Sequence, residues 1–202
     1  MRPFTSILAD PPWKYGDKLP ATDAGGERGA AGQYHVMTTD AICNLAHADE
    51  LGMKIAGHPV ADHAVLYCWV TNPFLLNGDG ARVCKAWGFE PKQLITWVKG
   101  RLVVSKLWGL EPHAELVLNV GLGRYTRGCT EHIILATRGR ATQLVLERNV
   151  PNVFMAPRTR HSAKPEAQYG LIERLTPGPY LEVFARQNRS GWTSFGDQLP
   201  VV

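Results

Sequence analysis

The feature that most restricts the fold of this chain is the uninterrupted apolar run Ala64–Val70, AVLYCWV. A strand with one solvated face alternates apolar and polar residues, whereas this run contains no charged or amide side chain. Continuous apolar strands are typical of sheets that helices cover on both faces. The run therefore favours an α/β fold in which the sheet lies between two outer layers.

The rest of the chain alternates between strand patterns and helix patterns. Further strands are predicted at Phe4–Asp10, Lys92–Lys99, Glu131–Arg138, Val153–Ala156 and Tyr180–Arg186. Helices are predicted over Thr38–Gly57, from Asn72 to about Trp87, and over Pro165–Leu175. This alternation predicts an α/β sandwich with a mostly parallel sheet, and 202 residues suit a single domain spanning 1–202.

Composition excludes several classes of protein. No apolar run approaches the roughly 18 residues that a membrane span needs, so we expect no membrane partner. The four cysteines are scattered without a C-x-x-C pair, which argues against disulfides and against a zinc cage. The sequence therefore predicts a cytoplasmic protein with no metal site.

Positive charge is concentrated in one region. From Lys92 to Lys164 there are 12 Lys and Arg residues against 4 Asp and Glu residues, although the whole chain carries a net charge of only +4. A one-sided basic region suits a polyanion such as nucleic acid. Many basic surfaces bind nothing, so this region supports a nucleic-acid partner only together with other observations.

The sequence Asp10-Pro11-Pro12-Trp13 directly follows the first predicted strand. Prolines cannot continue a strand ladder, so they should hold a rigid turn whose backbone carbonyls stay free. Ligands of open α/β sheets bind beyond the carboxyl ends of strands, where Asp10 lies. Residues 14–37, which lack an apolar period, are predicted to form a long mobile loop of the kind that often acts as a lid.

The chemistry of this turn suits an exocyclic amino group of a nucleobase. A carboxylate and a fixed carbonyl provide two acceptors for the two N–H bonds, and Trp13 could stack on the base. Methyl transfer to such a nitrogen from a sulfonium then depends mainly on in-line alignment. The alternative is that the four residues form only a strand-ending turn with a packed tryptophan.

The turn and five downstream segments resemble the DPPW-type N6-adenine methyltransferases. This family includes the catalytic subunit of the eukaryotic messenger-RNA adenosine methyltransferase and bacterial and phage relatives. The segments follow the family's order and cover nearly the whole chain: LYCWVTNP (66–73), ITWVKG (95–100), EHIILATRG (131–139), HSAKPEAQYGLIERLTPG (161–178) and LEVFARQNRSGWTSFGDQ (181–198). The resemblance implies a Rossmann-like S-adenosylmethionine-dependent fold of permuted topology, with the catalytic motif before the cofactor strand. It also implies methylation of adenine N6 in nucleic acid, with DNA favoured slightly over RNA.

The resemblance also implies which residues form the site. The catalytic residues are Asp10, Pro11, Pro12 and Trp13. The residues that bind S-adenosylmethionine are Asp10, Lys164, Glu182, Arg186, Asn188, Asp197 and Gln198. The residues expected to bind the substrate are Trp13, Tyr15, Lys99, Arg124, Tyr125, Glu131 and His132. The resemblance implies Glu131 and His132, whereas Lys99, Arg124 and Tyr125 are expected from their place near strand ends or in basic loops. Asp197 stands where the family has Asn, and the chain has no G-x-G-x-x-G loop, so the cofactor is implied by the resemblance alone.

Three other functions stay open. The first is the same transfer to N4 of cytosine, because two acceptors do not distinguish the two amino groups. The second is a non-catalytic family member that binds nucleic acid, against which the intact motif argues. The third is a metal-dependent hydrolase, although none of the seven histidines forms an H-x-x-x-H or H-x-H pair. The oligomeric state is also open, with a homodimer among the arrangements considered.

Overall fold

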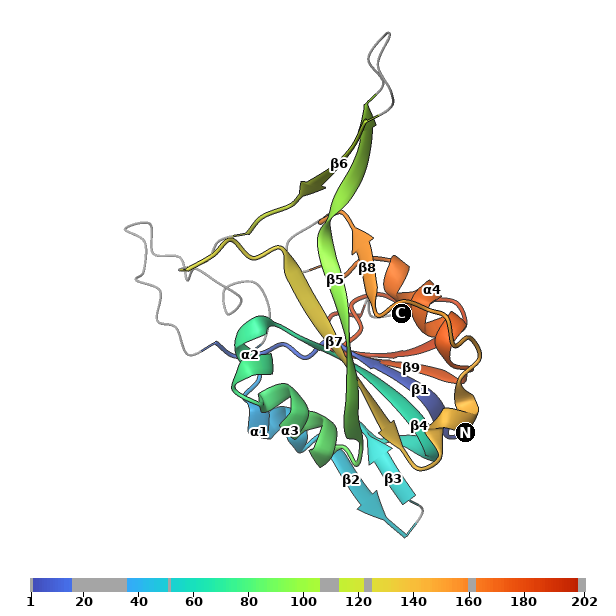
Figure 1. Ribbon diagram of the computed structural model, residues 1–202. Helices are drawn as coiled ribbons and strands as arrows, with labels where there is room; N and C mark the ends of the chain where they lie inside the picture. The colour runs from blue at the N-terminus through green and yellow to red at the C-terminus, as the bar shows by residue number, and fades with distance from the viewer. Residues whose placement is uncertain are drawn as a thin grey trace, which may run out of the picture.

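The computed structural model describes residues 2–15, 36–50, 52–105, 113–121, 125–159 and 163–199. Within them the main sheet has the strand order β10-β9-β1-β4-β7-β5-β6, and helices lie on both of its faces (Figure 1). The loop expected at 14–37 falls almost entirely outside the described residues. In the part of the chain that is described, no helix is long and apolar enough to cross a membrane.

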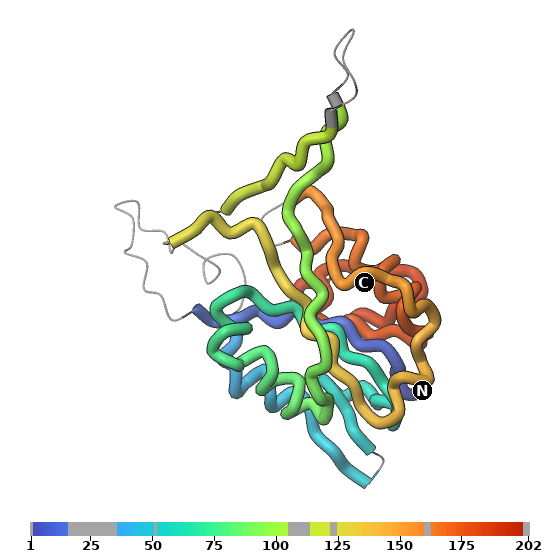
Figure 2. The backbone as a smooth tube through the Cα atoms, in the orientation of Figure 1, coloured from blue at the N-terminus to red at the C-terminus, as the bar shows by residue number. Residues whose placement is uncertain are grey.

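The parallel half of the sheet forms the edge that carries Asp10. Its strands are β10 (Trp192–Phe195), β9 (Tyr180–Val183), β1 (Phe4–Ala9) and β4 (His58–Val70). The last residue of β1, Ala9, lies opposite Val183 on one side and Cys68 on the other. The first and last parts of the chain therefore lie side by side (Figure 2). Asp10 leaves this edge between the ends of β9 and β4.

The other half of the sheet is antiparallel. Its main strands are β7 (Thr130–Arg138), β5 (Glu90–Ser105) and β6 (His113–Leu118). A short strand, β8 (Val153–Ala156), pairs with β5, and a hairpin of β2 (Ala46–Asp49) and β3 (Gly52–Ile55) extends from β4. Beyond the body of the sheet, β5 and β6 continue as a protruding two-stranded ribbon (Figure 1).

The prediction of a mostly parallel sheet is wrong, because the sheet is mixed. Of the nine strand pairings between described residues, four are parallel and five are antiparallel. The main reason is β7, which runs antiparallel to both of its neighbours, β4 and β5. The two hairpins add further antiparallel pairs.

The central strands are buried on both faces, as the apolar run predicted. No residue of Ala64–Val70 is more than 3% exposed. Leu66 and Cys68 belong to the core on one face, whereas Tyr67 and Trp69 belong to the core on the other. The helices of the first face are α1 (Thr39–Cys43), α2 (Asn72–Leu76) and α3 (Asp79–Ala86), and α4 (Ala167–Leu175) covers the second.

Two predicted helices are shorter than the sequence suggested. The segment Thr38–Gly57 is helical only in α1 and then forms the β2–β3 hairpin. Gly52, at the start of β3, and Gly57, in the turn between β3 and β4, have φ of 106° and 80°. The helix predicted from Asn72 onward is divided into α2 and α3 by Gly78, whose φ is 85°. Positive φ suits glycine and cannot occur inside a right-handed helix, so these glycines mark real breaks.

Candidate active site

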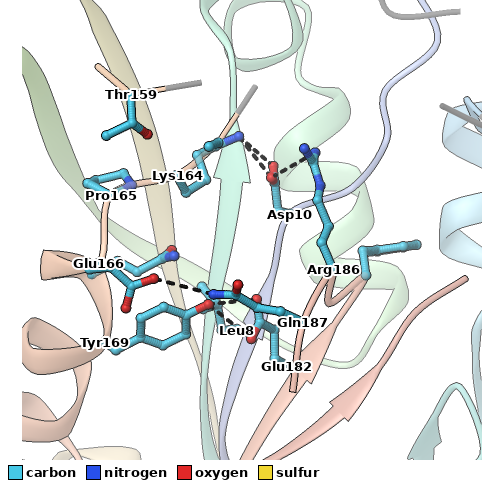
Figure 3. Close-up of a pocket in the computed structure, with 13 residues that line it drawn as sticks. Leu8, Asp10, Thr159, Lys164, Pro165, Glu166, Tyr169, Glu182, Arg186 and Gln187 are labelled. Carbon is cyan, nitrogen blue, oxygen red and sulfur yellow. Dashed lines mark hydrogen bonds and ion pairs between the residues drawn. The ribbon is translucent and has the colours of Figure 1, made fainter. Parts of the chain in front are cut away.

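Asp10 is the first residue after β1, and its side chain is 19% exposed. Lys164 Nζ lies 2.8 Å from Asp10 Oδ1 and 2.9 Å from Oδ2, and Arg186 Nη2 lies 3.6 Å from Oδ2 (Figure 3). The cation and the guanidinium come from segments that precede α4 and follow β9. Three separate parts of the chain therefore meet at one carboxylate.

The ammonium group of Lys164 also contacts a second carboxylate, that of Glu131 at the start of β7. The distance from Lys164 Nζ to Glu131 Oε2 is 3.4 Å, and Lys99 donates to Glu131 Oε1 at 2.6 Å. Burial lowers the pKa of Lys164, but Asp10 and Glu131 outweigh it, so this pKa lies above its usual value. Burial raises the pKa of Glu131, but Lys164 and Lys99 bring it below its usual value. The result is a chain of alternating charges from Lys99 to Asp10.

A cavity of about 400 Å³ adjoins Asp10 on the α4 side of the sheet. Its polar lining includes Asp10, Lys164, Tyr169, Glu182, Arg186 and Gln187 (Figure 3). The volume lies in the range of roughly 300–1,000 Å³ that is usual for small-molecule sites. Because Asp10 lies in the wall of this cavity and at the surface of the sheet edge, it can contact a cofactor and a second substrate.

Glu182 is the most buried acid of the cavity, at 9% exposure. The hydroxyl of Tyr169 donates to its carboxylate at 3.0 Å and 3.1 Å. Burial raises the pKa of Glu182 to about 7, although the hydrogen bond from Tyr169 acts in the opposite direction. The carboxyl group therefore holds its proton to a higher pH than an exposed glutamate does.

The two prolines do hold a turn, but their carbonyl groups are not free. The Trp13 N–H donates to the Pro11 carbonyl at 2.9 Å, and the Met37 N–H donates to the Pro12 carbonyl at 2.7 Å. The expectation of unused carbonyls is therefore wrong, because the local turn occupies one lone pair of the Pro11 carbonyl and the bridge to Met37 occupies one lone pair of the Pro12 carbonyl. A carbonyl oxygen has two lone pairs, so each can still accept one more hydrogen bond.

The stacking role expected for Trp13 conflicts with its position. Its indole is only 4% exposed, its Nε1 donates to the Trp69 carbonyl at 3.2 Å, and its ring stacks on Phe74 at 4.8 Å. In this arrangement the ring fixes the turn to the core and offers little surface to a base. Tyr15 is 41% exposed and hydrogen-bonded to Thr71 at 2.9 Å, so it is the aromatic side chain of this segment that a base can reach.

The other expected site residues are distributed unevenly. Lys164, Glu182 and Arg186 line the cavity with Asp10, as the cofactor role requires. The exposed residues Asn188, Asp197 and Gln198 are outside its lining, so their role stays a prediction. Tyr125 is 99% exposed, and Arg124 lies outside the described residues.

The cavity residues that were not predicted include Glu166 and Tyr169. Glu166 and Tyr169 are three residues apart at the start of α4, so they share one face of that turn. Glu166 accepts from Arg189 at 2.5 Å, and the Arg189 guanidinium lies 3.8 Å over the Tyr169 ring. The i, i+3 spacing of Glu166 and Tyr169 was the sequence signal that could have identified these two residues.

Comparison with known sequences identifies the family of this chain. The sequence profile of the MT-A70 family matches residues 4–198, nearly the full length. The chain belongs to the MT-A70 family. Among its relatives, the type II methyltransferase M.MunI of Mycoplasma sp is 27% identical over 201 residues, which cover 98% of this chain and 78% of the relative. The human N(6)-adenosine-methyltransferase catalytic subunit METTL3 is 27% identical over 202 residues, covering 97% of this chain and 28% of METTL3.

A Drosophila melanogaster N(6)-adenosine-methyltransferase MT-A70-like protein is 28% identical over 203 residues, which cover 97% of this chain and 27% of that relative. This MT-A70 chain thus spans only about a quarter of these eukaryotic relatives, but most of M.MunI. The comparisons confirm the resemblance and the α/β methyltransferase fold.

MT-A70 methyltransferases use S-adenosylmethionine, which supplies a methyl group bound to a sulfonium. The charged and polar groups that line the cavity fit S-adenosylmethionine. The cations Lys164 and Arg186 suit its carboxylate, and the carboxyl group of Glu182 can accept from a ribose hydroxyl. Within the described residues no group of three or more His, Cys, Asp or Glu residues could hold a metal ion.

The raised pKa of Glu182 predicts a pH-dependent contribution to stability. A carboxyl group with a pKa of about 7 when folded and near 4.5 when unfolded binds more protons in the folded state. Stability should therefore fall as pH rises from about 4.5 to about 7 and then level off. Relative to wild type, Glu182→Gln should gain up to roughly 3 kcal/mol over this window, measured by urea unfolding. Glu90→Gln, at an exposed position of β5, controls for loss of charge, and a pH-independent difference for Glu182→Gln would contradict the account.

Proposed function

We propose that this chain transfers the methyl group of S-adenosylmethionine to the N6 amino group of adenine in nucleic acid. The observation that carries the proposal is the position of Asp10, which lines the cavity and begins the Pro-Pro turn at the same sheet edge. The names of its relatives, an N(6)-adenosine-methyltransferase and a type II methyltransferase, support it.

Asp10, a proline carbonyl and Lys164 each have a role in this reaction. Asp10 accepts one N–H of the amino group, and the remaining lone pair of a proline carbonyl accepts the other. These two bonds turn the nitrogen lone pair toward the cavity, where alignment supplies most of the rate enhancement. Lys164 holds the Asp10 side chain in place, since it is hydrogen-bonded to that carboxylate at 2.9 Å. No strong general base is needed, because the nitrogen loses its proton readily once it is methylated.

Nucleic acid as the substrate is supported by where the basic region lies. It includes β5, β7 and β8, and Lys99 and Glu131 on β5 and β7 join Lys164 at the site. A nucleic acid bound along these strands would therefore lie next to Asp10. We propose DNA as the first substrate to test and RNA as the second.

Labelled S-adenosylmethionine and adenine-containing DNA and RNA oligomers test the proposal. We expect labelled N6-methyladenine with wild type and a loss of at least about 100-fold in activity for Asp10→Ala, because a group that holds the reacting atom is removed. Asp62→Ala, an exposed acid on β4, is the matched control and should retain activity. Equal activity of Asp10→Ala and wild type would refute the role of Asp10.

Transfer to N4 of cytosine is the second candidate, because two acceptors fit either amino group. Cytosine-containing oligomers without adenine belong in the same assay. Label in N4-methylcytosine alone would replace the adenine proposal with this one. Absence of label with either base would leave only the non-catalytic, nucleic-acid-binding alternative.

We also propose that the protein self-associates as a homodimer through the β5–β6 ribbon. Register places Leu102 opposite Leu116 and Val104 opposite Ala114, so these side chains share one face. Leu102, Leu116 and Val104 are 61%, 46% and 63% exposed. An isolated two-stranded ribbon is marginally stable in water, and burial of its exposed apolar face against a second copy would stabilise it.

Sedimentation velocity tests this assembly. Wild type should sediment as a dimer, and Leu102→Glu should shift it to the monomer, because a charge would be buried at the contact. Leu146→Glu, at a position that is 58% exposed elsewhere on the chain, is the matched control and should not change the assembly. A monomeric wild type would overturn the proposal.

A cytoplasmic location and a single domain remain proposals. All four cysteines are free, and Cys68 and Cys84 are buried. Free buried thiols are common in proteins that are kept in a reducing compartment. This supports the cytoplasmic proposal.

A further inference from the structure

A second polar cluster lies at the end of β4, next to the Asp10 edge. Asn72 is exposed and begins α2, two residues after the last residue of β4. His132 lies opposite Val70 in the β4–β7 pairing. His132 Nε2 is 2.9 Å from Asn72 Oδ1, and His132 Nδ1 is 3.1 Å from Thr96 Oγ1. Side chains from three elements therefore form one hydrogen-bonded chain that ends at the surface.

The orientation of the Asn72 amide determines the direction of these hydrogen bonds. Burial lowers the pKa of His132 more than Glu131 raises it, which favours the neutral ring with a single N–H. Because Asn72 Oδ1 can only accept, His132 Nε2 must donate to it, and Nδ1 then accepts from the Thr96 hydroxyl. Asn72 Nδ2 makes no hydrogen bond to any part of the chain that the structure describes, so it presents two N–H donors to solvent.

The catalytic turn runs along the end of β4 to the residue before Asn72. Trp13 donates to the Trp69 carbonyl, and two residues later Tyr15 is hydrogen-bonded to Thr71. The donor of Asn72 and the acceptor of Asp10 therefore lie on the same rim, at the carboxyl ends of the neighbouring parallel strands β4 and β1.

Two neighbouring residues at the start of β7 make contacts on opposite faces of the sheet. Glu131 and His132 are adjacent, so their side chains leave opposite faces of the sheet. Glu131 reaches Lys164 on the cavity side, whereas His132 reaches Asn72 on the α2 side. His132 thus makes a polar contact on the α2 side of β7, at the sheet edge where the target base must approach Asp10.

We infer that Asn72, oriented by His132 and Thr96, is a specificity residue that donates a hydrogen bond to a ring nitrogen beside the amino group of the target base. The inference rests on the proposed function. Asp10 would accept from the amino group while Asn72 donates to the ring, and this acceptor–donor pair matches the edge of adenine, where ring nitrogens N1 and N7 flank N6. His132 and Thr96 are positioning residues, because they act through Asn72.

Oligomers with one target base of adenine, 1-deazaadenine or 7-deazaadenine test this contact, since each analogue replaces one ring nitrogen with C–H. Wild type should methylate one of the two analogues about tenfold less efficiently than adenine in kcat/KM, the usual effect of one hydrogen bond. Asn72→Ala should lose about the same factor on adenine, and its ratio of kcat/KM for adenine to kcat/KM for that analogue should be about tenfold smaller than that of wild type. Because each comparison uses the same bases, differences in their intrinsic reactivity cancel between the two enzymes.

Controls separate this contact from a structural effect. Asn77→Ala, at the other end of α2, should keep the discrimination of wild type. Asn72→Asp keeps the size of the side chain but replaces the donor with an acceptor, so it should lose at least as much adenine activity as Asn72→Ala. His132→Ala should weaken the discrimination, because it releases the amide.

Two results would overturn the inference. One is a ratio of adenine activity to analogue activity that is the same in wild type and Asn72→Ala for both analogues, and the other is an Asn72→Asp variant that keeps the adenine activity of wild type. A wild type that methylates no adenine at all would instead refute the proposed function. The two failures are therefore distinguishable in one experiment.

Discussion

The ammonium group of Lys164 connects the parts of the active site. It is hydrogen-bonded to Asp10, lies 3.4 Å from Glu131, and its side chain is only 12% exposed. Without it, two partly buried carboxylates would lose their shared cation, and breaking such a buried pair typically costs about 3–5 kcal/mol. Since the three residues belong to the segment before α4, the end of β1 and the start of β7, this contact also joins the parallel and antiparallel halves of the sheet at the site.

Features of the fold that depend on burial were predictable from the sequence. The apolar run Ala64–Val70 forms the centre of the sheet, and β8 has the predicted bounds Val153–Ala156. Features that depend on strand direction were not, because an antiparallel β7 has the same apolar pattern as a parallel one. Local turns were missed for a related reason, since Gly52 and Gly78 interrupt segments whose side-chain spacing also fits a helix.

At the site, the sequence indicated the residue types better than their contacts. Asp10, Lys164, Glu182 and Arg186 do meet at one cavity, because the family order brings the ends of β1 and β9 together. Trp13 was assigned to the base, but its indole packs on Phe74 in the core. A motif cannot reveal which face of an aromatic ring is already covered. The same limit applies to Tyr169, whose hydrogen bond to Glu182 depends on how α4 packs on the sheet.

The central claim is that Asp10 receives the amino group of adenine while the adjoining cavity holds the cofactor. A crystal structure of the protein with S-adenosylhomocysteine and an adenine-containing oligomer tests it most directly. We expect the adenine N6 within hydrogen-bond distance of an Asp10 oxygen, and S-adenosylhomocysteine in the cavity lined by Lys164 and Glu182. An N6 group bound away from Asp10, or S-adenosylhomocysteine bound outside that cavity, would contradict it.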